Sequence, residues 1–345
     1  MSSIKRVTKF VLLTLAICIT ALSVSSGVTQ AKSSVNQFQV KPILPADNAA
    51  KSSYFDLKVK PSQSRTLKIR IFNNSTKRQQ FYVKPSNTTT SSLGAIAYTG
   101  STKKDASAAT AFSDMISDKT GKPVTIDGQS SATVSFKLNV PKQQFTGTVL
   151  GGFVVHSVSA SDHAAQNSGV NNLARYVVAV RLKESSTTVK PNLLYYGTHY
   201  VGMNGLPAIQ VKLQNNQPVI IGNVHLKATV TGEGNKTVAK VDNQLLNFAP
   251  TSRFNYTIST LNGQQLKTGQ YRLLMTVKGD NGYWKFDKLF TVTNSDTASA
   301  HVAKRPFDWW QLLQWVIEGL ATLIVLAYLV KKVRDWWRKD DDSKS

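Results

Sequence analysis

Short stretches in which apolar and polar residues alternate fill most of the middle of this 345-residue chain. Leu67, Ile69 and Ile71 alternate with Lys68 and Arg70. A period of two places successive side chains on opposite faces of a strand, so one face of each stretch is expected to be buried. Comparable stretches occur at 134–140, 209–213, 224–230, 254–258 and 271–277.

Turn-rich segments separate these stretches. Many short strands with such breaks predict an all-β fold, here two tandem immunoglobulin-like antiparallel β-sandwiches. Asn281-Gly282, at the end of Gly279-Asp280-Asn281-Gly282, lies between two strand stretches. The dipeptide accepts positive φ values and predicts a two-residue hairpin turn.

The domain boundaries rest on polar segments. Residues 157–172 are small, polar and without periodicity, as expected of a long loop or domain junction. The apolar run that follows, within 175–183, predicts a central strand covered on both faces. The sequence leaves open whether this strand completes the first sandwich or begins the second. We therefore place the domains at 33–157 and 168–293, with a spacer at 294–308.

The N-terminus predicts a signal peptide at 1–31. Lys5, Arg6 and Lys9 precede an apolar run that ends near Leu22, and small residues then lead to a cleavage site after Ala31. The alternative is a lipoprotein signal at Cys18. Ile17 stands where that signal requires Gly or Ala, which disfavours it.

A second apolar segment, 312–330, predicts a transmembrane helix within 309–330. Its roughly 19 residues make about 28 Å of helix, enough to cross a hydrocarbon core. Five tryptophans fit interfacial belts at its two ends: Trp309, Trp310, Trp315, Trp336 and Trp337. A basic cluster of Lys331, Lys332 and Arg334 follows. By the positive-inside rule, tail 331–345 is expected in the cytoplasm and both sandwiches in the cell-wall space.

Glu318 lies inside the predicted span. A carboxylate at the bilayer centre costs roughly 2.5 to 3.5 kcal/mol on insertion scales. Either Glu318 reaches the interface or becomes protonated, or it pairs with a partner helix that Gly319 allows to approach closely. The sequence favours the first reading.

Cysteine content and charge further limit the cellular location and the ligands expected of this protein. Without Cys18 the mature chain has no thiol, which excludes disulfides and thiolate sites and favours a Gram-positive surface. The exported part carries 33 Lys and Arg against 14 Asp and Glu, a net charge of about +19. Such a field attracts polyanions, which outside a Gram-positive membrane are anionic wall polymers, namely teichoic acids, and the carboxylates of wall peptides. Topology excludes nucleic acid, and solvated strand faces account for part of the excess.

Several short segments, taken in order, resemble the WxL-interacting protein family of Gram-positive bacteria. They are FQVKPILP at 38–45, YFDL at 54–57, VP at 140–141, FTGTVLGG at 145–152, QNNQP at 214–218 and GQYRL at 269–273. The resemblance implies an N-terminal domain that binds peptidoglycan and a following domain that binds a host matrix protein. It also implies partnership with surface proteins that carry the Trp-x-Leu wall-binding motif.

The segment 145–152 is the candidate binding segment or structural turn, through Phe145, Gly147, Gly151 and Gly152. Its glycines allow the backbone to approach another surface closely. They equally relieve crowding inside a sandwich, and the sequence favours this second reading.

Enzyme signals are weak. Ser101 and Lys104 match S-x-x-K, and Lys119-Thr120-Gly121 matches K-T-G, the outer motifs of penicillin-recognising enzymes. Both fall in one polar stretch of about 20 residues, whereas those enzymes carry them far apart, so chance explains the match. The histidines show no zinc-ligand spacing. No catalytic residue, cofactor or metal is expected.

We therefore expect a membrane-anchored, wall-associated scaffold or adhesin. It binds the wall through its first domain and a WxL protein or host matrix protein through its second, and it contacts lipid through its helix. The alternatives are a wall-modifying enzyme and an accessory subunit that acts through its helix.

Overall fold

The computed structural model describes residues 38–49, 52–158, 175–203 and 205–300, with single residues between 313 and 334. The described part is built almost entirely of strands. It divides into two compact units. The first comprises the chain up to Asn192 with Asn215–Gly222 and Asn247–Arg253, and the second comprises Leu193–Gln214, Asn223–Leu246 and the chain from Phe254.

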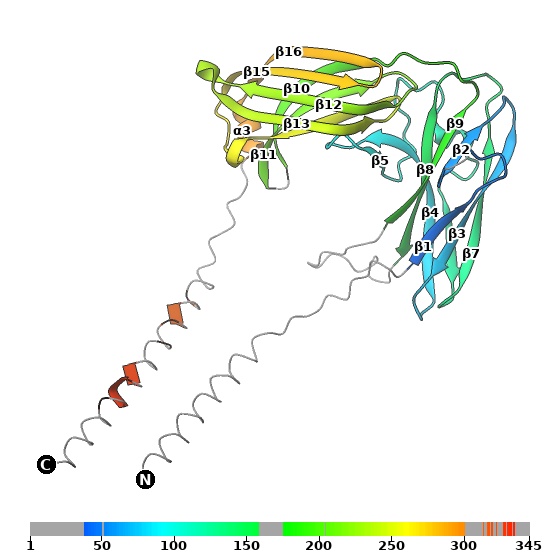
Figure 1. Cartoon of the computed structure of the whole chain (residues 1–345), viewed down its shortest axis with the longest axis horizontal. Coiled ribbons are helices and arrows are strands. Elements are labelled where there is room, and N and C mark those ends of the chain that lie inside the picture. The colour runs from blue at the N-terminus through cyan, green and yellow to red at the C-terminus, as the bar shows by residue number, and fades with distance from the viewer. Residues whose placement is uncertain are drawn as a thin grey trace, which may run out of the picture. The chain divides into compact units, whose positions relative to one another are not determined.

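Two sheets form the first unit (Figure 1). The three-stranded sheet has the order β1 (Phe38–Ile43), β3 (Ser64–Asn73), β7 (Ser131–Asn139). The six-stranded sheet has the order β2 (Phe55–Lys58), β9 (Arg175–Lys183), β8 (Val149–Val158), β4 (Gln79–Thr90), β5 (Ile96–Tyr98), and β6 (Lys122–Ile126) also pairs with β4. The short helix α2 (Phe112–Met115) completes the unit.

The core of the first unit lies between these sheets. Phe38 of β1 packs on Phe81 of β4, with ring centroids 5.0 Å apart. Phe136 of β7 packs on Phe153 of β8 at 4.5 Å. Full burial of such side chains stabilises a fold by roughly 1.5 to 3 kcal/mol each. The alternation predicted for β3 is therefore confirmed, with Leu67, Ile69 and Ile71 in this core.

Strand β9 belongs to the first unit. It pairs antiparallel with β8, where Gly151 lies opposite Val180, and parallel with β2, where Phe55 lies opposite Val180. Both Val180 and Leu182 are fully buried. The strand whose membership the sequence left open thus lies inside the six-stranded sheet of the first sandwich.

The second unit also contains two sheets. One has the order β10 (Leu193–Met203), β11 (Leu206–Asn215), β14 (Ser252–Ser259), and the other β13 (Thr237–Phe248), β12 (Ile221–Thr231), β15 (Gly269–Gly279), β16 (Gly282–Val292). Alternate residues of both sheets are buried, among them Ile209, Leu226, Tyr256 and Leu273. Short helical segments are η3 (Glu233–Asn235), η4 (Leu261–Gly263) and α3 (Asn294–Ala300). The predicted β-sandwich sheets are thus confirmed, but the first unit is not purely antiparallel, because β2 pairs parallel with β9.

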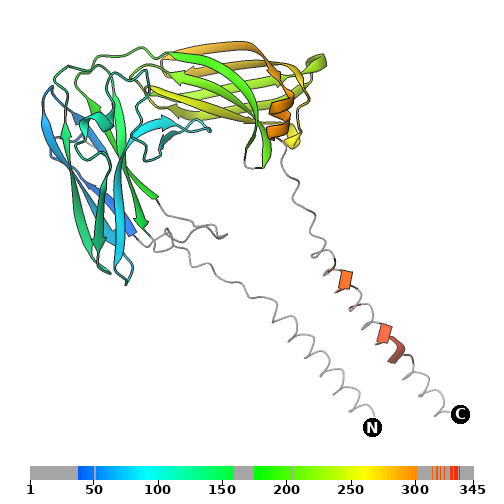
Figure 2. The same cartoon turned by 180° about the vertical axis from the view of Figure 1, so that it is seen from behind.

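The hairpin predicted near residue 281 joins β15 to β16, side by side in both views (Figure 2). Its turn lies one residue earlier than expected, because Gly279 pairs with Gly282 and leaves Asp280 and Asn281 between the strands. Neither turn residue has a positive φ. Gly282 instead makes room for Trp284, whose ring would lie 2.1 Å from an added Cβ.

Residues 294–300, expected as the start of the spacer, form helix α3. The Asp296 carboxylate accepts the backbone N–H of Thr293 at 2.8 Å, and the Thr293 hydroxyl accepts the backbone N–H of Asp296 at 3.3 Å. This reciprocal pair is a capping box. Gly202 of β10 permits the close approach of Ala300, which is buried.

Candidate functional site

The outer face of the three-stranded sheet in the first unit carries four cations. Lys68 and Arg70 lie on β3, Lys41 on β1 and Lys137 on β7, and all four are exposed. The pairing places Lys41 opposite Arg70 and Lys137 opposite Thr66. Because β3 lies between the other two strands, these side chains share one surface, which we call the basic face.

No carboxylate of the described residues forms an ion pair with any cation of the basic face. Arg70 instead donates from Nε to the Ser131 hydroxyl at 3.1 Å. Lys41 Nζ and the Arg70 guanidinium carbon lie 5.7 and 5.3 Å from the centroid of the Phe72 ring. Like charges directly opposite each other on a sheet destabilise it, so this arrangement favours an anionic ligand.

Six other cations of the first unit have carboxylate partners. Arg65 donates two hydrogen bonds to Asp47, and this contact lowers the pKa of the carboxyl. The hydrogen bond from Arg181 to Asp56 raises the pKa of the guanidinium. The remaining ion pairs are Arg78 with Asp127, Lys104 and Lys119 with Asp114, and Lys122 with Asp118. The basic face is distinguished because four cations without a carboxylate partner among the described residues share one sheet surface.

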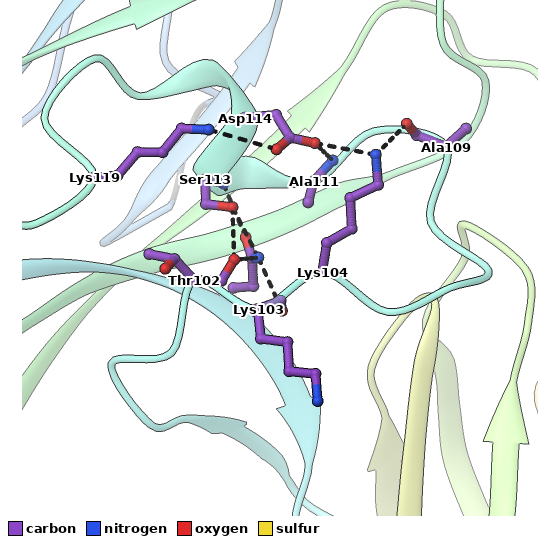
Figure 3. Close-up of polar contacts among 9 residues, drawn as sticks. Thr102, Lys103, Lys104, Ala109, Ala111, Ser113, Asp114 and Lys119 are labelled. Atoms are coloured by element: carbon purple, nitrogen blue, oxygen red, sulfur yellow. Dashed lines mark hydrogen bonds and ion pairs between the residues drawn. The ribbon is translucent and has the colours of Figure 1, made fainter.

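The lysines of the S-x-x-K and K-T-G matches both contact Asp114 (Figure 3). Lys104 Nζ donates to Asp114 at 3.2 Å and to the Ala109 carbonyl at 2.8 Å, and Lys119 Nζ lies 3.8 Å from the same carboxylate. The Ser101 hydroxyl accepts the backbone N–H of Lys103 at 3.1 Å. Both lysines therefore fix a loop to the start of α2.

A buried amide holds this loop to the sheet. Asn87 of β4 donates to the carbonyls of Thr102 and Lys103 and to the Ser113 hydroxyl, and it accepts the backbone N–H of Ser113. Ser113 also donates to the Thr102 carbonyl, as Figure 3 shows. The side-chain polar groups of Asn87 and Ser113 all have hydrogen-bond partners within the first unit, so the role of this network is structural.

The predicted segment 145–152 lies inside the first unit. Phe145 is buried, and its backbone N–H donates to the Glu184 carboxylate at 2.9 Å. Gly147 has a φ of 77°, and a Cβ there would lie 2.2 Å from the Pro218 carbonyl oxygen. The next residue, Thr148, donates its N–H to that oxygen at 2.7 Å. This turn packs against its own unit.

Gly151 and Gly152 are buried in β8. A Cβ at Gly151 would lie 2.2 Å from the Phe112 ring of α2, and one at Gly152 would lie 2.7 Å from the Val178 carbonyl oxygen. The ring of Tyr98, whose pKa burial raises to about 12, would lie 3.0 Å from that same Cβ at Gly152. Both glycines thus lack a Cβ where neighbouring groups of the sandwich pack too closely to leave room for one.

The second unit has an open sheet face of a different kind. Leu289, Tyr283 and Leu274 are 69, 64 and 39 % exposed on the face that β15 and β16 share. Arg272 donates two hydrogen bonds to Asp287 between them, which lowers the pKa of that carboxyl. The exposed Lys278 and Lys285 share this face. Apolar groups mixed with a charge pair are of the kind found in protein interfaces.

On the same sheet, His225 Nε2 lies 2.5 Å from Asp242, and Lys227 lies 3.1 Å from it. Both contacts lower the pKa of Asp242, and the hydrogen bond with His225 has the larger effect. The described part of the chain contains no group of three or more side chains that could hold a metal ion.

Most predicted terminal residues lie outside the described residues. They are Ala31, Trp309, Trp310, Trp315, Glu318, Trp336 and Trp337. Lys331, Lys332 and Arg334 are helical and exposed. Among the described residues, no helix has the length and apolar character that a membrane crossing requires.

The sequence identified Lys68 and Arg70 as polar positions of a strand but did not predict the basic face. Lys41 joins it through the pairing of β1 with β3, and a period of two gives no information on which strands pair. Two sequence features could have indicated this face. Gln39, Lys41 and Ile43 occupy alternate positions of one stretch, and Phe72 follows Arg70 by two residues.

Two family models match the chain in succession. Residues 38–157 match "WxL Interacting Protein, peptidoglycan binding domain", and residues 165–301 match "WxL Interacting Protein, host binding domain". No curated protein matches. The second match includes β9, although that strand lies in the sheet of the first unit.

Solved structures that resemble the chain include the Escherichia coli chaperone DraB, with 12 % identity over 74 % of this chain and 95 % of that one, at a TM-score of 0.27. The YadV chaperone has 10 % identity over 74 % of this chain and 100 % of that one, also at a TM-score of 0.27. Red sea bream transglutaminase has 12 % identity over 75 % of this chain and 31 % of that one, at a TM-score of 0.22. Scores this low carry no argument about this chain.

Proposed function

The chain belongs to the WxL-interacting protein family, and we propose that it is a non-catalytic scaffold that binds the cell wall through the basic face of its first domain. Its two domain families make it a cell-surface binding protein. The second domain, in this proposal, binds a WxL protein or a host matrix protein.

The unpaired charge of the basic face is the observation that carries this proposal. Four exposed cations share one sheet surface, and no described carboxylate pairs with them. Exposed charges of one sign attract a polymer of opposite sign, and salt screens that attraction over about 8 Å at physiological ionic strength. A wall is a dense array of such polymers, so even weak single contacts give firm retention.

The open sheet face of the second unit supports a protein partner. Leu274, Leu289 and Tyr283 provide apolar area, and the Arg272–Asp287 pair supplies a polar contact among them. Aromatic groups and arginine are enriched in protein interfaces. A WxL protein encoded with this chain, or a matrix protein, is the proposed occupant.

We further propose that both domains are immunoglobulin-like and that a transmembrane helix at 309–330 holds them in the wall space. The apolar segment 312–330 and the basic residues from Lys331 onward support this topology. Protease added to wall-stripped cells should then degrade the exported domains and leave a small C-terminal fragment. Protection of the region before Trp309 would contradict it.

Binding to purified sacculi tests the wall-binding role. The full-length protein in non-ionic detergent should pellet with sacculi at low salt. The basic-face variant K68Q/R70Q/K137Q should pellet at least tenfold less. The matched control K236Q/K240Q/K267Q changes the net charge equally in the second unit and should pellet like the parent. A parent protein that stays in the supernatant at low salt refutes the role.

A further inference from the structure

We infer that two copies of this chain associate through β16, the edge strand of the four-stranded sheet in the second unit. The two strands pair antiparallel in one register, centred on Phe286. This contact involves neither the wall ligand nor the protein partner proposed above.

Strand β16 ends its sheet with an open edge. It pairs with β15 on one side, and within the described part of the chain no strand pairs with its other side (Figure 1). Strand β10 of the facing sheet approaches it through side chains, with the ring centroids of Tyr195 and Phe286 5.9 Å apart. Unpaired N–H and C=O groups along such an edge form a template for another strand.

The edge of β16 is regular enough to accept a partner strand. Its pairing with β15 runs without interruption from Gly282 to Val292, and none of these described residues has a positive φ. The opposite edge of the same sheet differs, because Leu245 of β13 has a φ of 57°. A residue in that conformation interrupts continuous pairing. Strand β16 is therefore the edge of this sheet that can pair over most of its length.

Symmetry limits the registers that two copies of β16 can use. A two-fold axis perpendicular to the sheet joins the outer faces of both copies into one surface. Residues that lie opposite each other must then share a face, so the pairing is centred on one residue of β16. Even-numbered residues face the core, since Phe286 lies opposite the buried Met275. The outer face carries Tyr283, Lys285, Asp287 and Leu289.

Pairing centred on Phe286 matches the charges of the two copies. Lys285 then lies opposite Asp287 of the second copy, and Tyr283 lies opposite Leu289 of the second copy. Opposite charges and apolar groups at directly opposite positions stabilise an antiparallel pair of strands. The register pairs residues 282–290 of each copy, so each favourable contact is made twice.

Asp287 has room for this second cation. Arg272 of the same chain donates two hydrogen bonds to its carboxylate and holds it on the outer face. A carboxylate offers about four lone-pair sites, so Lys285 of the second copy shares the group with Arg272.

The neighbouring registers lack this match. Centring the pairing on Lys285, Asp287 or Lys288 places that charge opposite its own copy, and like charges directly opposite each other destabilise a sheet. Centring it on Trp284 or Leu289 pairs no opposite charges and shortens the paired segment. The charges of β16 therefore select one register and oppose the others, which is how an edge strand avoids indiscriminate pairing.

The paired copies form one continuous sheet. Tyr283 of each copy then adjoins Leu289 of the other on the outer face, where these side chains are 64 and 69 % exposed in the single chain. Self-association thus joins the apolar groups of two open sheet faces into a single larger patch.

Sedimentation equilibrium of the full-length protein in non-ionic detergent tests the self-association. An edge-to-edge contact is small, so the parent should form a dimer whose fraction rises with protein concentration. K285D and D287K each place like charges opposite each other and should weaken the association at least tenfold. An equimolar mixture of the two variants should regain the dimer, because the introduced Asp then faces the introduced Lys and native Lys285 faces native Asp287.

K278D is the matched control for K285D. Lys278 lies on β15, opposite Tyr283 and away from the free edge, so the same change of charge should leave the dimer intact. A parent that stays monomeric at every concentration would overturn the inference. Equal dimerisation of the parent and both edge variants would also overturn it, because the contact would then lie elsewhere in the chain. A mixture that fails to regain the dimer would overturn the register.

Disulfide cross-linking tests the register without changing a charge. Cys18 is the only cysteine of the chain, so the variants Y283C and L289C are made with C18S. The two variants, mixed and oxidised, should cross-link, since opposite Cβ atoms lie about 5 Å apart and a disulfide needs about 4 Å. Either variant alone should not, because its two thiols lie at opposite ends of the paired segment. Cross-linking of one variant alone, or none in the mixture, would overturn the register centred on Phe286.

Discussion

Arg181 of β9 donates two hydrogen bonds to the carboxylate of Asp56 in β2, although 125 residues separate them in the sequence. The Nε to Oδ1 distance is 2.8 Å, and Asp56 also lies opposite Arg181 in the parallel pairing of the two strands. The Arg181 guanidinium further lies 5.9 Å from the Tyr54 ring centroid. These contacts join a strand beyond residue 174 to the first strands of the chain.

The position of β9 predicts that truncation after residue 157 unfolds the first sandwich. A fragment of residues 38–157 lacks Val178, Val180 and Leu182, each buried in the core. Their burial stabilises the fold by roughly 1.5 to 3 kcal/mol each, against a typical total of about 5 to 15 kcal/mol. Circular dichroism and urea titration should show a cooperative transition for 38–192 and none for 38–157. Equal urea midpoints would contradict the prediction.

The Asp56–Arg181 pair itself should be measurably stabilising. Both side chains are only partly exposed, so D56A leaves a half-buried guanidinium without its acceptor. After allowance for solvent screening, we expect a loss of about 1 to 2 kcal/mol in the free energy of unfolding. The double variant D56A/R181A should lose less than the sum of the single variants, as a double-mutant cycle by urea unfolding would show. Strict additivity would mean that the pair contributes nothing.

Local patterns in the sequence predicted the strands well and their partners poorly. The alternation at 67–71 gave β3 and the apolar run at 175–183 gave β9, because burial of one or both faces leaves a periodic trace. The sheet that β9 joins depends on contacts with β2, more than 100 residues earlier, which no local pattern records. The basic face was not predicted for the same reason, since Lys41 and Lys137 join Lys68 and Arg70 only through the registers of β1 and β7.

The role of Gly282 also differs between the sequence prediction and the structure. The sequence predicted a positive φ in the hairpin that contains Gly282, whereas the structure uses that glycine for contact with Trp284. A missing Cβ serves either purpose, and only the three-dimensional neighbours distinguish them.

Gly151→Ala should destabilise the first unit through overlap with Phe112. The added Cβ would lie 2.2 Å from the ring, close to its attachment point, so the helix α2 must move. Overpacking of this kind costs about 1 to 3 kcal/mol, and F112A alone about 3 to 5 kcal/mol. The double variant G151A/F112A should lose less than the sum, since the methyl group enters the vacated space.

Gly234→Ala is the matched control for that cycle. An added Cβ there meets no atom within 4 Å, but the residue has a φ of 64°. Its cost therefore comes from the backbone alone, and F112A should not reduce it. Rescue of Gly234→Ala by F112A would show that the cycle reports general destabilisation.

Ser252→Ala should weaken a buried hydrogen-bond network of the first unit. The Ser252 hydroxyl accepts the backbone N–H of Thr90 at 2.8 Å and donates to the Thr90 hydroxyl at 3.2 Å. Both residues are buried, so removal of the hydroxyl leaves a backbone donor without its partner, at a cost of about 1 to 3 kcal/mol. Urea unfolding of the full-length protein measures this loss. S299A, which removes an exposed hydroxyl from α3, should cost less.

The cap of α3 predicts an acid-dependent loss of stability. Hydrogen bonds from the backbone and side chain of Thr293 lower the pKa of Asp296 below its ordinary value of 3.8. A depressed carboxyl pKa gives stability that is fully present above 3.8 and is lost as the pH falls through the lower, folded-state value. At pH 7, D296N should therefore be less stable than the parent by roughly 0.5 kcal/mol, since the carboxylate is partly exposed and solvent screens its charge.

Urea unfolding of both proteins from pH 7 to pH 2.5 measures this dependence. The difference between the parent and D296N should hold down to about pH 4 and shrink below pH 3.8, because the parent then loses the charged cap as well. S299A on the same helix removes a hydrogen bond to the Asp296 carbonyl but no titrating group, so its difference from the parent should not change with pH. A D296N difference that is equally constant would mean that the Asp296 charge does not stabilise α3.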